Sequence, residues 1–166
     1  QEGTKNIMIR NIASKNPSKA FVLPLKIEDQ IESWSAVGHG LGYYIVYVDG
    51  DSLIGQTKLK VTFLKWENGG PNINWTKAIT VENIHMTAPV LVSTLGSLKI
   101  LMTNWMDEES TVAHYLVEDG EFSFVNYYGV FVQGAQIQAA FSREGRLFSL
   151  IREKTKEQWA YSLCEH

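Results

Sequence analysis

The chain has 166 residues, of which 45% are hydrophobic and 11% are aromatic, and its formal net charge is −3. This composition excludes an intrinsically disordered chain, and the length suits one compact domain that spans residues 1–166. The sequence contains one cysteine, Cys164, which excludes an intramolecular disulfide framework. No run of residues approaches the ~18 apolar positions of a membrane-spanning helix, so any membrane contact is expected to be peripheral.

The charged residues are distributed unevenly along the chain. No lysine or arginine lies between Lys99 and Arg143. The acids of this stretch are Asp107, Glu108, Glu109, Glu118, Asp119 and Glu121. The basic residues on either side include Lys5, Arg10, Lys15 and Lys19 in a first block, and Arg143, Arg146, Arg152 and Lys154 in a second. We predict that the basic blocks bind an anionic surface, such as a membrane, and that the acids face basic residues of a second copy. The alternative is that the blocks neutralise each other within one molecule.

Most of the chain shows the two-residue period of half-buried strands, as in Lys58–Phe63, where polar and apolar residues alternate. In chain order, the β-rich runs are residues 7–12, 20–25, 43–48, 58–63, 76–81, 90–94, 98–102, 111–117, 122–132, 137–141, 147–151 and 159–163. Turn residues such as Asp119-Gly120 and Glu144-Gly145 separate them. We therefore predict a mainly β, single-domain antiparallel sheet system, either an open sheet or sandwich or alternatively a barrel.

One segment has a different period. Ile27, Ile31 and Trp34 lie at i, i+4 and i+7, acids crowd the start of the segment, and Gly38 follows its end. This spacing predicts one helix over residues 27–37. The N-terminal segment up to about Lys19 is expected to be mobile.

No residue pattern indicates catalysis or a cofactor. The glycine-rich run 38–42 follows the expected helix and precedes a strand, which is the reverse of the order in phosphate-binding loops. The four histidines, His39, His85, His114 and His166, are not at metal-ligand spacing, and no serine lies in a nucleophile elbow. The aromatic run 122–132 lies in the acidic stretch, which argues against nucleic acid as a partner. We therefore predict a non-enzymatic protein with no metal and no cofactor.

Two stretches resemble rhabdovirus matrix proteins. The first is residues 58–66 running into Gly69-Gly70-Pro71, and the second is residues 145–154 followed by Trp159. The resemblance implies an open sheet with packed helices, self-association into a lattice, and contact with nucleocapsid and the anionic inner membrane leaflet. It also implies a location in the virion or the host cytoplasm.

Two other stretches, residues 98–105 and 113–120, are similar to the later strands of lipocalins. This second resemblance implies a calycin barrel that is secreted and carries a small apolar ligand. The two resemblances therefore predict different functions: a self-associating viral structural protein, or alternatively an extracellular carrier.

Overall fold

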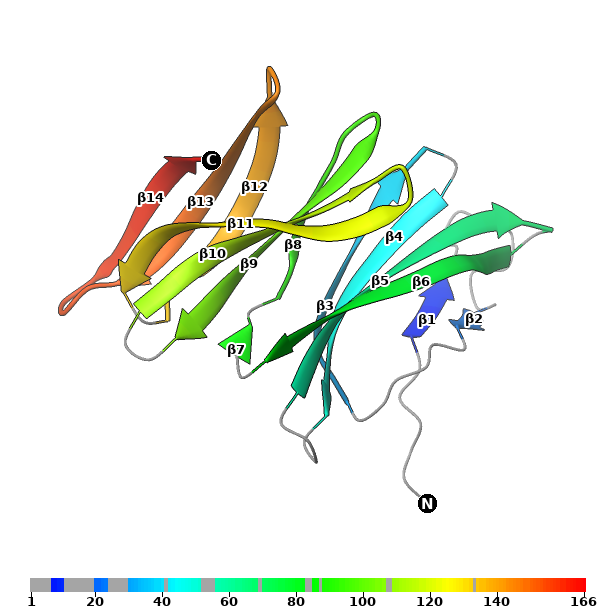
Figure 1. Cartoon of the computed structure of the whole chain (residues 1–166), viewed down its shortest axis with the longest axis horizontal. Helices are drawn as coiled ribbons and strands as arrows, with labels where there is room; N and C mark the ends of the chain where they lie inside the picture. The colour runs from blue at the N-terminus through cyan, green and yellow to red at the C-terminus, as the bar shows by residue number, and fades with distance from the viewer. Residues whose placement is uncertain are drawn as a thin grey trace.

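The chain was analysed as a computed structural model, which describes residues 7–10, 20–23, 30–40, 42–51, 56–68, 70–82, 85–86, 88–106, 109–132 and 134–166. These residues form strands joined by turns and contain no helix, so the mainly β prediction is confirmed. Figure 1 shows three sheets fanned side by side, with a small hairpin beyond the first of them. The hairpin pairs β1 (Ile7–Arg10) with β2 (Ala20–Leu23), and β2 lies against the first of the three sheets.

Each of the three sheets is an antiparallel meander, in which consecutive strands are neighbours except that β7 and β8 both pair with β9. The first meander consists of β3 (Gln30–His39), β4 (Gly42–Asp51), β5 (Gln56–Glu67) and β6 (Gly70–Glu82). In the second, β7 (His85–Met86) and β8 (Val90–Ser93) both pair with β9 (Ser97–Met106), followed by β10 (Glu109–Glu118) and β11 (Glu121–Val132). The third consists of β12 (Gln136–Arg143), β13 (Arg146–Lys154) and β14 (Trp159–Glu165).

Two of the hairpin turns have the backbone that the sequence predicts. Asp119 and Gly120 have φ values of 49° and 76°, and Glu144 and Gly145 have values of 52° and 79°. Positive φ at both central residues is the type I′ geometry, whose twist matches that of the flanking strands. Asp-Gly and Glu-Gly turns therefore set the register of β10 on β11 and of β12 on β13.

The meanders pack face to face, and two apolar cores hold them together. The first core joins Val46 and Val61 of the first meander to Ile100 and Tyr115 of the second. The second core joins the opposite face of the second meander, including Leu101, to the third meander. Burial of apolar surface on both faces of β9 and β10 makes the second meander the central layer.

One strand of each meander lies next to a strand of the neighbouring meander, β3 against β8 and β8 against β12. Two side-chain contacts join β3 to the β8 segment: the Ser35 hydroxyl donates to the Pro89 carbonyl, and His39 Nδ1 lies 2.8 Å from Ser93 Oγ. This fan of meanders resembles consecutive blades of a β-propeller. The described sheets are open, so they do not form the barrel considered as the alternative.

The prediction of a helix over residues 27–37 is wrong. Residues from Gln30 onward form β3, while residues 27–29 lie outside the described part of the chain. Side-chain burial along β3 alternates with a period of two: Val37 packs on the first core, whereas the Trp34 side chain is exposed. The helical spacing of the isoleucines and Trp34 was overridden by pairing with β4 and packing against β8.

The face of β4 and β5 that points away from the second meander is also buried. It carries Ile45 and Tyr47, together with an ion pair between Asp49 and Lys60. The Asp49 side chain is 0% exposed and the Lys60 side chain 8%. A buried ion pair of this kind loses hydration on folding, so its two charges depend on each other.

Candidate functional site

The third meander presents one face to solvent. Leu147, Ile151 and Cys164 point into the second core, so the residues that alternate with them along β13 and β14 point outward. The outward residues are Phe141 and Arg143 on β12, Arg146, Phe148, Leu150, Arg152 and Lys154 on β13, and Trp159, Tyr161, Leu163 and Glu165 on β14. We call this surface the Arg–aromatic face. It combines an apolar centre with four cations, which is unusual for a sheet surface that only meets water.

The apolar centre of this face is strongly exposed. Trp159, Tyr161 and Leu163 are 48%, 60% and 63% exposed, and Phe141 is 45% exposed. The Phe141 and Phe148 rings stack with centroids 5.2 Å apart, as expected for residues directly opposite each other in the β12–β13 ladder. Contiguous exposed aromatic and aliphatic side chains of this size mark interaction surfaces.

The cations of the face are partly oriented by neighbouring groups. Arg152 donates from Nη2 to Gln136 Oε1 at 2.6 Å, and its guanidinium lies 4.3 Å from the centroid of the Trp159 ring. Arg146 Nη1 lies 3.3 Å from Glu165 Oε1. The Arg152 contacts hold a flat cation against an aromatic ring, an arrangement that can bind carboxylates without a large loss of side-chain entropy.

The structure gathers the whole second basic block on the Arg–aromatic face. The first basic block is not brought to it: Lys5, Lys15 and Lys19 lie outside the described residues, and Arg10 lies in β1, at the opposite end of the molecule in Figure 1. Most of the segment expected to be mobile, up to about Lys19, also lies outside the described residues. The two basic blocks therefore do not form one surface in the part of the chain that is described.

The predicted acidic group is divided by the structure. Asp107 and Glu108 lie outside the described residues. Glu109 begins β10, whereas Glu118, Asp119 and Glu121 surround the turn at the other end of β10, about 30 Å away for a ten-residue strand. Glu121 Oε1 lies 3.1 Å from Lys77 Nζ on β6, so part of the acidic charge is paired within the molecule.

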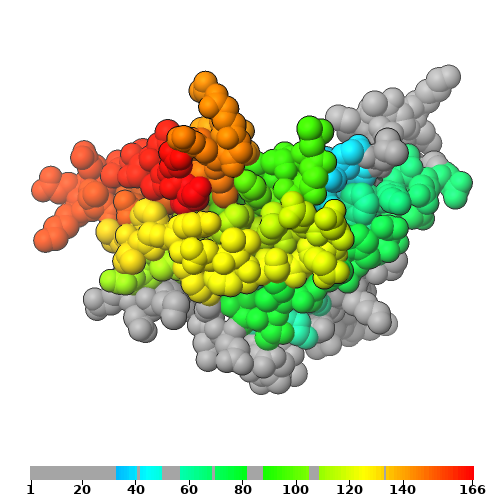
Figure 2. Space-filling view, turned by 45° about the horizontal axis from the view of Figure 1, so that its top comes forward, coloured from blue at the N-terminus to red at the C-terminus, as the bar shows by residue number. Residues whose placement is uncertain are grey.

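An exposed apolar strip runs along β11 beside the acidic turn. Figure 2 shows β11 lying across the front of the molecule, between the first and third meanders. Its exposed apolar side chains are Phe124, Val125, Tyr127, Val130 and Val132. We call these residues, together with Glu118, Asp119 and Glu121, the β11 strip. Its chemistry is complementary to that of the Arg–aromatic face, because both are apolar and their flanking charges are opposite.

Two histidines lie between the second and third meanders. His114 Nδ1 is 3.2 Å from the Tyr128 hydroxyl, the His166 ring packs on Tyr128 with centroids 4.8 Å apart, and His166 Nε2 is 2.6 Å from Ser149 Oγ. Burial lowers the pKa of both imidazoles; that of His114 falls from 6.5 to about 4, with further contributions from Lys99 and His166. Ser149 is 0% exposed, so the Ser149–His166 pair has no access to a substrate and serves to attach the third meander to the second.

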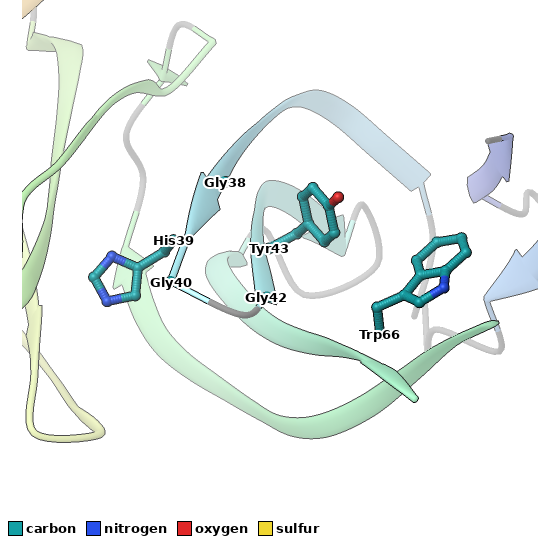
Figure 3. Close-up of a pocket in the computed structure, with 6 residues that line it drawn as sticks. All are labelled: Gly38, His39, Gly40, Gly42, Tyr43 and Trp66. Carbon is teal, nitrogen blue, oxygen red and sulfur yellow. The ribbon is translucent and has the colours of Figure 1, made fainter. Parts of the chain in front are cut away.

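A shallow pocket of about 350 Å³ lies at the turn between β3 and β4. Figure 3 shows the Tyr43 and Trp66 rings well apart beside Gly38, Gly40 and Gly42, and His39 directed to the other side of the β3–β4 hairpin. His39 Nδ1 is engaged by Ser93 Oγ on β8. None of the lining residues is a carboxylate or an alcohol or thiol nucleophile, so the pocket does not offer the groups of a hydrolytic site.

The described part of the chain contains no group of three His, Cys, Asp or Glu side chains that could hold a metal ion. No helix within the described ranges is long and apolar enough to cross a membrane. Comparison with protein-family models and with curated proteins finds no match for this chain.

Sequence reasoning missed the apolar half of the Arg–aromatic face. Trp159, Tyr161 and Leu163 fall in a run that the sequence correctly assigns to a strand, but the run alone does not show which of its faces is exposed. Their spacing of two places them on one face, opposite the smaller Ala160, Ser162 and Cys164. This alternation of large and small residues was the available signal.

Proposed function

We propose that this chain is a non-enzymatic assembly protein that self-associates, with the Arg–aromatic face of one copy bound to the β11 strip of another. The observation that carries the proposal is the exposed cluster of Phe141, Trp159, Tyr161 and Leu163 surrounded by arginines. Trp, Tyr and Arg are the residue types that dominate binding energy at protein interfaces. Self-association is also the property that the resemblance to rhabdovirus matrix proteins implies.

The charges favour a contact between two different surfaces. The Arg–aromatic face carries Arg143, Arg146, Arg152 and Lys154, whereas the acidic turn of the β11 strip carries Glu118, Asp119 and Glu121. Placing two Arg–aromatic faces against each other would oppose like charges. A contact between different surfaces leaves a free surface on each copy, so it builds open chains or lattices rather than closed dimers.

The size of the face predicts a weak contact. Three strands about 4.8 Å apart and about nine residues long cover a plane of about 14 by 30 Å, or about 400 Å². Two partners then bury about 800 Å² or somewhat more, which is at the low end of specific interfaces. We therefore expect reversible association that depends on concentration and on salt.

The proposal is tested by sedimentation velocity across concentrations at low and high salt. The wild-type chain should form species whose mass rises with concentration and falls in salt. Arg143→Glu/Arg146→Glu should no longer form the larger, salt-sensitive species, and neither should Glu118→Lys/Glu121→Lys. An equimolar mixture of the two variants should associate again, because the reversed charges are complementary.

A matched control is Lys65→Glu, which reverses an exposed charge on β5, a strand that belongs to neither surface. This variant should sediment as the wild type does. Wild-type behaviour of Arg143→Glu/Arg146→Glu would contradict the proposal. A salt-indifferent monomer that binds anionic phospholipid vesicles would also contradict it and would reassign the basic face to a membrane.

A carrier function of the lipocalin kind is not proposed. The described strands form open sheets, and apolar side chains of neighbouring meanders fill the space between one sheet and the next.

A further inference from the structure

The third meander has three strands, whereas the first has four and the second has five. Next to β5 and β10, the first and second meanders each have a further paired strand, β6 and β11, whereas none of the described strands pairs with the outer edge of β14. The free edge of β14 thus occupies the position at which β6 and β11 pair in the neighbouring sheets.

The outer edge of β14 lacks the features that protect four other edges of the described sheets. Among the described edge strands, β3, β6, β11 and β12 each have a register shift in their ladder. The β13–β14 ladder is regular over its whole length. The sequence of β14 contains no lysine and no proline, and it is rich in residues that favour strands. An edge without bulge, lysine or proline is a template for pairing with another strand.

Two backbone hydrogen bonds show which groups face this edge. His166 N donates to the Leu147 carbonyl at 2.8 Å, and Thr155 N donates to the Gln158 carbonyl at 2.9 Å. In an antiparallel ladder hydrogen-bonded and non-bonded pairs alternate, so the even-numbered residues of β14 pair with β13. The N–H and C=O groups of Trp159, Tyr161, Leu163 and Glu165 therefore point toward the free edge.

We infer that β14 pairs antiparallel with β14 of a second copy about a two-fold axis, which joins the two third meanders into one continuous sheet. Overlap of all seven residues places Ser162 opposite Ser162 of the second copy, and Tyr161 opposite Leu163. The only charged residue of the strand, Glu165, then lies opposite Trp159 rather than opposite a like charge. Paired about this axis, the two Arg–aromatic faces lie on the same side of the sheet.

This inference rests on the proposed self-association and adds a contact through a different surface. The edge contact is symmetric and closes a dimer, whereas the contact between the Arg–aromatic face and the β11 strip remains open. A chain with one contact of each kind can extend in more than one direction. The two contacts together would therefore build a lattice rather than a single row.

The register is tested by disulfide trapping of the full chain in a Cys164→Ser background. Residues opposite each other in a non-hydrogen-bonded pair have Cα atoms about 4.5 Å apart, within the range of a disulfide. Ser162→Cys should form a disulfide-linked dimer under mild oxidation. Ala160→Cys is the matched control: it lies opposite residue 164, which is serine in this background, so it should not link. Ala160→Cys with Cys164 retained should link again.

A second pair of variants tests the edge without a cross-link. Leu163→Pro removes one N–H that points to the free edge and leaves the ladder with β13 intact. It should raise the dissociation constant of the dimer about ten-fold or more, because each copy loses a hydrogen bond. Leu163→Ala removes the side chain but keeps the N–H, and it should have a clearly smaller effect in sedimentation equilibrium.

The inference is overturned if Ser162→Cys links no more than Ala160→Cys in the same background. Adding Arg143→Glu/Arg146→Glu to the Ser162→Cys chain separates the two proposals. Linked dimers that no longer form larger species support both contacts. Absence of linkage while the wild type still associates through its arginines refutes only the edge pairing. Linkage combined with wild-type sedimentation of the arginine variant refutes only the proposed role of the Arg–aromatic face.

Discussion

The histidine cluster between the second and third meanders predicts that acid weakens the fold. The pKa of His114 falls from 6.5 to about 4, first through burial and then through the nearby charges of Lys99 and His166. The folded chain therefore binds this proton more weakly than the unfolded chain. The corresponding stability is fully present above about pH 6.5 and is lost as the pH falls toward 4.

The magnitude follows from the pKa difference. The whole shift corresponds to about 3 kcal/mol of preference for the neutral ring, of which about 2 kcal/mol is lost between about pH 8 and pH 5. Partial screening by solvent reduces this loss to about 1–2 kcal/mol. With a urea dependence of about 2 kcal/mol per M, the unfolding midpoint should fall by about 0.5–1 M.

The assay is urea unfolding of the wild type and of His114→Gln at about pH 8 and pH 5. Glutamine keeps a neutral hydrogen-bonding group beside the Tyr128 hydroxyl and cannot take up a proton. The variant should therefore lose less stability in acid than the wild type does. Titration of the His114 ring by NMR provides an independent measurement, since the ring should stay neutral down to about pH 5. Equal losses in both proteins, or a ring that titrates near pH 6.5, would refute the reasoning.

Three further predictions concern the interior and are measured by urea unfolding at neutral pH. Asp49→Ala should lower the free energy of unfolding by about 3–5 kcal/mol, because the Lys60 ammonium stays buried and loses this carboxylate. Asp49→Leu/Lys60→Met, which removes both charges, should lower it far less. Equal costs would contradict this prediction. Gly42→Ala should cost about 1–3 kcal/mol, since its new Cβ would lie 2.3 Å from the Leu64 carbonyl oxygen, and wild-type stability would contradict the clash. Ile100→Ala should cost about 2–5 kcal/mol, because Ile100 is fully buried in the first core; a loss below about 1 kcal/mol would contradict that packing.

The charged half of the candidate site could be predicted from sequence because it depends on short-range order. Arg146, Arg152 and Lys154 lie six and two positions apart in one strand. Because these differences are even, the three side chains share a face of β13. Arg143 joins them through the turn at Glu144-Gly145, which pairs it directly with Arg146. The apolar half could not be recognised as a surface from β14 alone, since burial of its other face depends on a core contributed by β9 and β10.

The acidic group shows the opposite case. Its residues are close in sequence, but the nine steps along β10 from Glu109 to Glu118 rise about 30 Å and hold these two residues far apart. Closeness along the chain predicts closeness in space only within a turn, as at Glu118–Glu121. The pairing of Glu121 with Lys77 of the first meander joins segments that no local pattern connects.

The sequence by itself determined the mainly β class, most of the strand positions and the turns at Asp119-Gly120 and Glu144-Gly145, because side-chain alternation and glycine conformation are local properties. It did not determine the secondary structure of residues 30–39. Their helical spacing of apolar residues was outweighed by pairing with β4 and packing against β8. Only the tertiary structure decided which strand faces are covered. Stacking of three meanders buries both faces of the central sheet and leaves one face and one edge of the third meander in solvent, and this difference depends on contacts between residues far apart in the chain.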